Sequence, residues 1–140
     1  MSLLLQALLI STIISTHARY VPPFTVNLDS VIRCEKYNAF WSARVELADY
    51  AGNMIHETKT QFLHNQNEIV FQLPAELYGI VETNAHRGLK GIIHHTCAKD
   101  NTNLIHEQNF YNFSKNSKNE VNLKINMTID DIGSSEFLYF

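Results

Sequence analysis

The sequence has little charge and no excess of basic residues. Charged side chains make up 18% of the 140 residues, and the formal net charge is −3 at pH 7. Nucleic-acid binding depends on clustered Lys and Arg side chains that neutralise phosphates, so this composition excludes a nucleic-acid partner. The length suits one domain with one core, and a hydrophobic fraction of 45% is ordinary for a globular protein.

The sequence also lacks the short motifs of common catalytic and metal sites. It contains no Gly-rich phosphate loop, no Gly-x-Ser-x-Gly nucleophile motif, and no His-Glu-x-x-His or Cys2His2 pattern. Internal repeats and low-complexity segments are missing as well. We therefore predict that the protein is not an enzyme and has no catalytic residue, no metal site and no cofactor. The alternative is a small secreted enzyme or metal-binding protein that uses the histidines.

Residues 1–18 contain no charged side chain at all. This segment, MSLLLQALLISTIISTHA, carries a long apolar run, and Thr16 and Ala18 suit the −3 and −1 positions of a cleavage site. It predicts a secretory signal peptide, followed by a soluble extracellular domain over residues 19–140. The alternative is an uncleaved signal anchor, but the run from Leu3 to Ile14 is shorter than the ~20 residues that a bilayer requires. No other segment is a candidate membrane span.

Alternation of apolar and polar residues indicates β-strands through most of the domain. Successive side chains of a strand point to opposite faces, so a half-buried strand has an apolar residue at every second position. Segment 24–49 shows this pattern twice, on either side of a loop. The cleanest example is 120–129, with a predicted inward set of Val121, Leu123, Ile125, Met127 and Ile129. Further strands are expected over 54–60, 68–73, 89–97 and 104–113.

Six to eight short strands with turns between them indicate an all-β fold, an immunoglobulin-like β-sandwich. One segment departs from the strand pattern. Pro74 is expected to end the strand before it and to open a helix. Apolar residues then follow helical spacing, so we predict one short helix or helical turn near residues 75–84.

The sequence has only two cysteines, Cys34 and Cys97. In a secreted protein both would lie in an oxidising compartment, where pairing is expected. Both fall on the inward parity of their strands, so they can meet across the core, as a structural disulfide requires. The alternative is Cys97 as a catalytic thiolate beside His94 or His95, which needs a free thiol. We predict the Cys34–Cys97 disulfide.

Two blocks of residues resemble the nematode transthyretin-like family. The first is a strand that ends in Cys, Thr25–Cys34, followed by a strand similar to Ala-x-Val-x-Leu-x-Asp, Ala43–Asp49. The second is Ile92–Cys97, an apolar residue, His, one residue and Cys at the end of a strand. The chain resembles a divergent member, since residues 64–68 read HNQNE in place of an acidic turn with Gly, and a second Cys pair is missing.

The resemblance implies a secreted, transthyretin-like β-sandwich that binds at cell surfaces or in the extracellular fluid. Its partner is then an extracellular protein such as a cell-surface receptor, a lipid or a small apolar ligand. The family implies no agreed catalytic residues. The 5-hydroxyisourate hydrolases share the transthyretin fold and carry a C-terminal Tyr-Arg-Gly-Ser, whereas this chain ends in Ser-Glu-Phe-Leu-Tyr-Phe and has its Arg-Gly pair at Arg87 and Gly88. Hydrolase activity is therefore not expected.

Seven histidines are many for a chain of this length. His94 and His95 look like a metal pair, but neighbours in a strand point to opposite faces and are poorly placed to share one ion. Four other histidines have no ligand spacing among them: His56, His64, His86 and His106. We expect surface and core histidines rather than ligands.

Two sequons, Asn112-Phe-Ser and Asn126-Met-Thr, are candidate N-glycan acceptors in a secreted protein. Asn126 falls on the polar parity of its strand, together with Asn122 and Lys124, and should face water. If either sequon is used, its Asn must be exposed in the folded domain.

Overall fold

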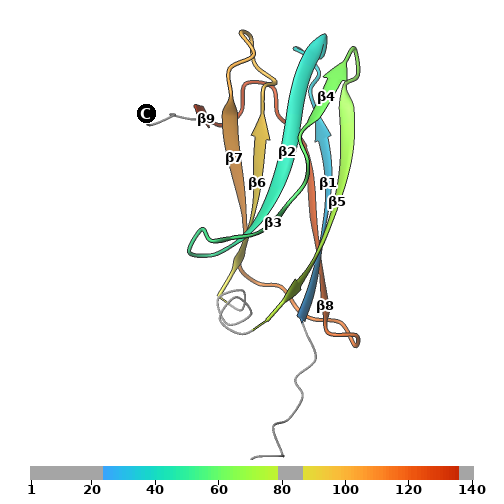
Figure 1. Cartoon of the computed structure of the whole chain (residues 1–140), viewed down its shortest axis with the longest axis vertical. Coiled ribbons are helices and arrows are strands. Elements are labelled where there is room, and N and C mark those ends of the chain that lie inside the picture. Colours follow the sequence, from blue (N-terminus) through green and yellow to red (C-terminus); the bar gives the residue numbers. More distant parts are fainter. Residues whose placement is uncertain (1–23, 79–86, 136–140) are drawn as a thin grey trace, which may run out of the picture.

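The computed structural model describes residues 24–78 and 87–135. In those residues it confirms an all-β fold without helix, in which two sheets pack face to face as a β-sandwich (Figure 1). The segment that we predict to be a signal peptide, residues 1–18, lies outside the described residues.

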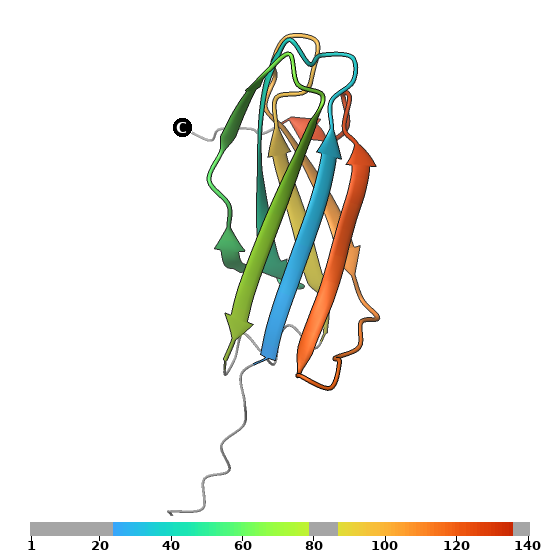
Figure 2. The same ribbon diagram turned by 90° about the vertical axis from the view of Figure 1, so that its right-hand side faces the viewer.

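The first sheet has three strands in the order β5-β1-β8 and is seen face on in Figure 2. Its central strand is β1 (Phe24–Arg33), which runs antiparallel to β5 (Glu68–Leu77) and parallel to β8 (Glu120–Thr128). A parallel pair cannot be joined by a tight turn, so the chain builds most of the second sheet between β1 and β8.

The faces predicted for the strand over 120–129 are confirmed. Four of the five predicted inward residues are buried, and Met127 is partly buried against the core. The outward residues Asn122, Lys124 and Asn126 are exposed. The alternation therefore assigned the inner and outer faces of β8 correctly.

The second sheet has the order β3-β2-β6-β7-β9, with β4 also paired to β2. Its strands are β2 (Phe40–Asp49), β3 (Met54–Glu57), β4 (Gln61–His64), β6 (Leu89–His95), β7 (Leu104–Phe110) and the two-residue β9 (Ser134–Ser135). β3 and β4 follow one another along the same edge of β2. The strand predicted over 54–60 is present but ends at Glu57, and β4 lies beyond the predicted range, where no strand was expected.

The break in the edge has a local cause at Thr58. Its N–H donates to the Val45 carbonyl at 2.9 Å, and its hydroxyl accepts from the Val45 N–H at 3.0 Å. The Thr58 hydroxyl therefore replaces the backbone carbonyl that would accept from Val45 in a regular strand pair. The register also shifts between Leu47 and Ala48. Regular pairing resumes only at Gln61, where β4 begins.

The helix predicted near residues 75–84 is wrong for residues 75–77, because β5 continues through Pro74 to Leu77. Among the strands that the structure describes, β5 pairs only with β1, and an outer strand tolerates a proline since one of its sides needs no N–H donor. Ala75 and Leu77 are buried and continue the alternation of the strand. The rest of the predicted helix, 79–84, lies outside the described residues.

The core lies between the two sheets and is filled by side chains from both. Its largest fully buried member is Trp41, whose indole N–H donates to the Gln66 carbonyl at 2.7 Å. The predicted disulfide is confirmed at one end of this core, where Cys34 and Cys97 are both fully buried with Cα atoms 5.8 Å apart. A catalytic role for the Cys97 thiolate does not fit the paired sulfur.

Candidate functional site

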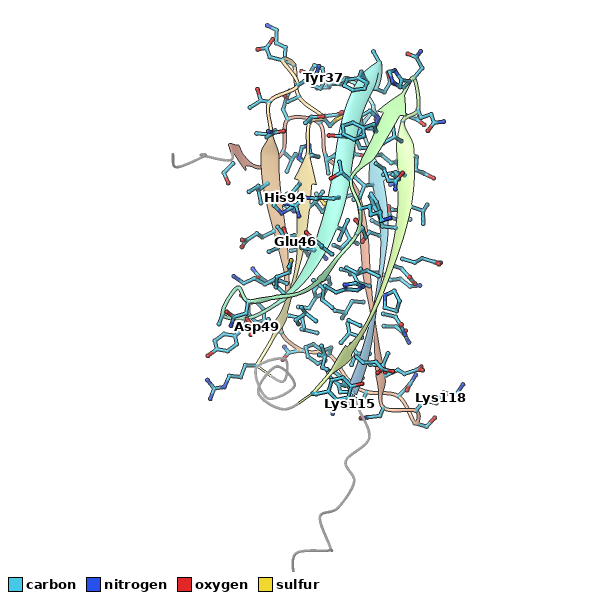
Figure 3. All side chains as sticks on the ribbon, viewed as in Figure 1. Tyr37, Glu46, Asp49, His94, Lys115 and Lys118 are labelled. Atoms are coloured by element: carbon cyan, nitrogen blue, oxygen red, sulfur yellow. A yellow bond between two sulfur atoms is a disulfide. The ribbon has the colours of Figure 1, made fainter. Side chains whose placement is uncertain are left out.

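The outer face of the second sheet carries a cluster of charged side chains around Arg44. Arg44 and Glu46 alternate with the buried Val45 along β2, so both point outward. The strand pairings place Arg44 beside His94 of β6, and Glu46 beside Glu57 of β3. Figure 3 shows Glu46 and His94 next to each other on this face. We call these four residues the Arg44 cluster.

Arg44 connects the other three members. Its Nη1 lies 2.6 Å from Oε2 of Glu57 and 3.3 Å from Oε2 of Glu46. Its Nη2 lies 3.3 Å from Nδ1 of His94. A guanidinium only donates, so Nδ1 is the acceptor, and Nε2 of His94 donates its proton to Glu46. Both ring nitrogens of His94 are therefore engaged within the cluster.

The cluster is partly shielded from water. The side chains of Glu46 and His94 are each 15% exposed, and that of Arg44 is 28% exposed. Glu46 and Glu57 are cross-strand partners of the same charge, an arrangement that is unfavourable unless a cation lies between them. Arg44 supplies that cation, so the positions of the three side chains depend on one another.

The break between β3 and β4 opens a depression beside the cluster. It has a volume of about 510 Å³ and is lined by Arg44, Glu57, Thr58, Lys59 and Thr60. A smaller depression of about 100 Å³ shares Arg44 and Thr60 and extends toward Ser42, His94 and Thr96. We call the two together the Arg44 groove. Its lining of guanidinium, carboxylate and hydroxyl groups suits a polar or charged segment of a partner.

Exposed aromatic side chains lie where β4 pairs with the start of β2, next to the groove. Phe62 is 68% exposed and Phe40 is 42% exposed, and their rings stack with centroids 6.4 Å apart. The ring of His64 lies 4.8 Å from that of Phe40. Large aromatic side chains left in water are more informative than single aliphatic ones, because aromatic residues are enriched at protein interfaces.

His95 points to the opposite side of the sheet from His94, as the sequence predicted. It is 3% exposed; its Nδ1 accepts from the Cys97 N–H at 3.2 Å, and its Nε2 donates to the Ile132 carbonyl at 2.7 Å. Burial lowers the pKa of His95, and the hydrogen bond to Ile132 opposes this only in part. His95 is therefore a neutral structural link between β6 and the turn before β9.

Two aspartates tie the disulfide end of the sandwich together. Oδ1 of Asp130 accepts from the N–H groups of Glu35 and Lys36 at 2.9 and 3.0 Å. The hydroxyl of Tyr37 donates to Asp131 at 2.7 Å, and this hydrogen bond raises the pKa of Tyr37. Asp130 also lies close to the sulfurs of both cysteines, but the disulfide leaves no thiolate to bind a metal ion.

The remaining predicted residues are dispersed. Asn112 and Asn126 are both exposed, His56 and His64 are exposed, and His86 lies outside the described residues. Arg87 donates to the Tyr50 hydroxyl at 2.9 Å from the turn before β6. The alternation in segment 24–49 puts Arg44 and Glu46 on the polar face of their strand, but it does not reveal the cluster, because alternation does not show that β6 lies beside β2.

In comparisons of the chain with protein-family models, curated proteins and solved structures, no family, protein or structure matches. Over residues 24–78 and 87–135, no helix has the length and apolar character needed to cross a membrane.

Proposed function

We propose that the protein is a secreted extracellular binding module of the transthyretin-like type, and that its partner is an extracellular protein such as a cell-surface receptor. The Arg44 groove carries this proposal. Its charged groups are already held in place by one another, so binding would cost little side-chain entropy. Arg and aromatic residues are also the side chains most often found at the centres of protein interfaces.

A lipid or a small apolar ligand fits this geometry less well. Sites for such ligands are concave and mostly apolar, with a few polar groups that set orientation. The Arg44 groove has charged and hydroxyl-bearing walls, and the space between the sheets is occupied by packed side chains such as Trp41 and Phe24. The exposed Phe40 and Phe62 form a flat stacked pair that suits a protein surface.

The alternative of a small secreted enzyme or metal-binding protein has less support. Both nitrogens of His94 are engaged by Arg44 and Glu46, and both nitrogens of His95 are engaged by the backbone. A metal ion would have to displace these partners. His94 and His95 line the smaller depression, but their ring nitrogens are occupied by these hydrogen bonds.

The first experiment tests secretion. The full chain is expressed in eukaryotic cells with its own N-terminus, and the protein in the medium is sequenced from its N-terminus. We expect the secreted chain to begin near Arg19. A protein that stays in the cell, or that still begins at Met1, would contradict the proposal.

The second experiment tests the binding face. Fluorescently labelled protein is titrated onto intact cells of the tissue that expresses the chain, and Arg44→Glu is compared with the wild type. The matched control is Lys124→Glu, which makes the same charge change on the outer face of the other sheet. We expect Arg44→Glu to weaken binding at least tenfold and the control to leave it unchanged. Equal effects of the two variants would contradict the assignment of the face.

A further inference from the structure

We propose that Asn112 and Asn126 both carry N-linked glycans, and that these glycans cover the β8 side of the sandwich and leave the Arg44 groove open. The inference rests on the secretion that we propose above, because N-glycans are added in the secretory pathway. It goes beyond that proposal by assigning two modification sites and by giving the domain a covered side and a binding side.

Asn126 meets the geometric requirement on β8. Its side chain is exposed, whereas the next residue, Met127, packs against the core. Arg33 donates from Nη1 to the carbonyl oxygen Oδ1 of Asn126 at 2.6 Å. The glycan is attached to the other atom of the amide, Nδ2, so the contact with Arg33 can remain when a sugar is present. Since a glycan is bulky, only an exposed acceptor is compatible with the fold.

Asn112 meets the same requirement in the loop between β7 and β8. Asn112 and Ser114 are exposed, while Phe113 between them is partly buried. The ring of Phe113 stacks on Phe24, with centroids 6.2 Å apart. Both sequons therefore have the same arrangement. A middle residue anchored on the core turns the preceding Asn toward water.

β8 lies at the edge of the first sheet, so glycans on this side also affect whether another chain can pair with it. Within the described part of the chain, no strand pairs with the outer side of β8. An open strand edge invites pairing with another chain, and bulky polar groups beside it hinder such pairing. β8 and the loop before it lie on one side of the sandwich, and β3 and β4 lie on the other (Figure 2). The Arg44 groove is on the β3 and β4 side and stays accessible.

The test uses the full chain secreted from eukaryotic cells. Treatment with peptide-N-glycosidase converts a glycosylated Asn to Asp, and peptide mass mapping locates the change. We expect Asp at both 112 and 126. Ser114→Ala and Thr128→Ala should each remove one glycan, whereas Thr128→Ser and Asn122→Gln should retain both, which separates loss of a sequon from loss of the fold.

If the secreted wild-type protein has no glycosidase-sensitive sites, the proposal that Asn112 and Asn126 are glycosylated is wrong, while the proposed function is unaffected. To separate the two proposals in the other direction, a strong leader is fused ahead of the full chain. If only this fusion is secreted, and it carries both glycans, the proposed secretion by the native N-terminus fails and the two acceptor sites stand. Deglycosylated protein should bind cells with the same affinity as the glycosylated form. At least tenfold weaker binding after deglycosylation would contradict the proposal that the glycans lie away from the binding face.

Discussion

Ile125 of β8 occupies the space that the missing side chain of Gly91 leaves in β6. A Cβ atom on Gly91 would lie 2.6 Å from Cδ1 of Ile125 and 3.5 Å from Cε2 of Phe110. Ile125 belongs to the first sheet and Gly91 to the second, and both are buried. The pair therefore sets how closely the two sheets approach at this level of the core.

Gly91→Ala should lower the free energy of unfolding by about 1–3 kcal/mol, because an added methyl group forces a packed core to shift. Chemical denaturation measures the change. Val lacks the Cδ1 atom, so adding Ile125→Val to Gly91→Ala should restore part of the loss, although Ile125→Val alone should cost about 1 kcal/mol. Additive losses in the double variant would show that the two residues do not compete for the same space.

Loss of the Cys34–Cys97 disulfide should lower the free energy of unfolding by about 4 kcal/mol in the chain-entropy model for a sequence separation of 63 residues. The measurement compares oxidised protein with a Cys34→Ala/Cys97→Ala double variant in urea. Non-reducing peptide mapping of the wild type provides the control. Two free thiols in folded secreted protein would contradict the pairing.

His95 should make the protein less stable in acid. Burial lowers its pKa in the folded state, so the unfolded chain takes up a proton near the ordinary value of about 6.5 while the folded protein stays neutral. The free energy of unfolding should therefore fall as the pH drops below about 6.5. Nearby charges also affect the pKa of this ring: His106 lowers it, whereas Asp130 and Asp131 raise it.

The pH dependence is measured by thermal unfolding between neutral and mildly acidic pH. His95→Gln should flatten the slope in this range, and His56→Gln, an exposed control, should leave it unchanged. If the wild type is equally stable across the range, or if both variants behave alike, the assignment to His95 is incorrect.

Arg44→Ala should lower the free energy of unfolding by about 1 kcal/mol, a value near the upper end for exposed ion pairs, because this network is partly buried. The loss of the guanidinium leaves Glu46 and Glu57 facing each other. Adding Glu57→Gln to Arg44→Ala should therefore recover part of the stability. A double variant less stable than Arg44→Ala alone would show that repulsion between the carboxylates is not the cause.

The sequence predicted the faces of the strands well, because the period of two in a strand is written directly in the residue order. It identified the buried set of β8, the inward position of both cysteines and the exposure of Asn126. The strand through Pro74 was predicted to end too early. A proline is tolerated in an edge strand, and the neighbouring residues do not reveal whether a strand lies at a sheet edge. β4 was also missed, because its boundaries depend on how Thr58 pairs with β2.

The amino-acid sequence by itself determined which side of each strand is apolar, and with it the all-β class and a core that the two cysteines can reach. Only the tertiary structure decided which strands are neighbours. The parallel pairing of β1 with β8 and the contact of Arg44 with His94, which lie 50 residues apart in the sequence, follow from the register between strands. Alternation fixes the face of a side chain but not its cross-strand partner, because pairing is selected by the packing of the whole sandwich.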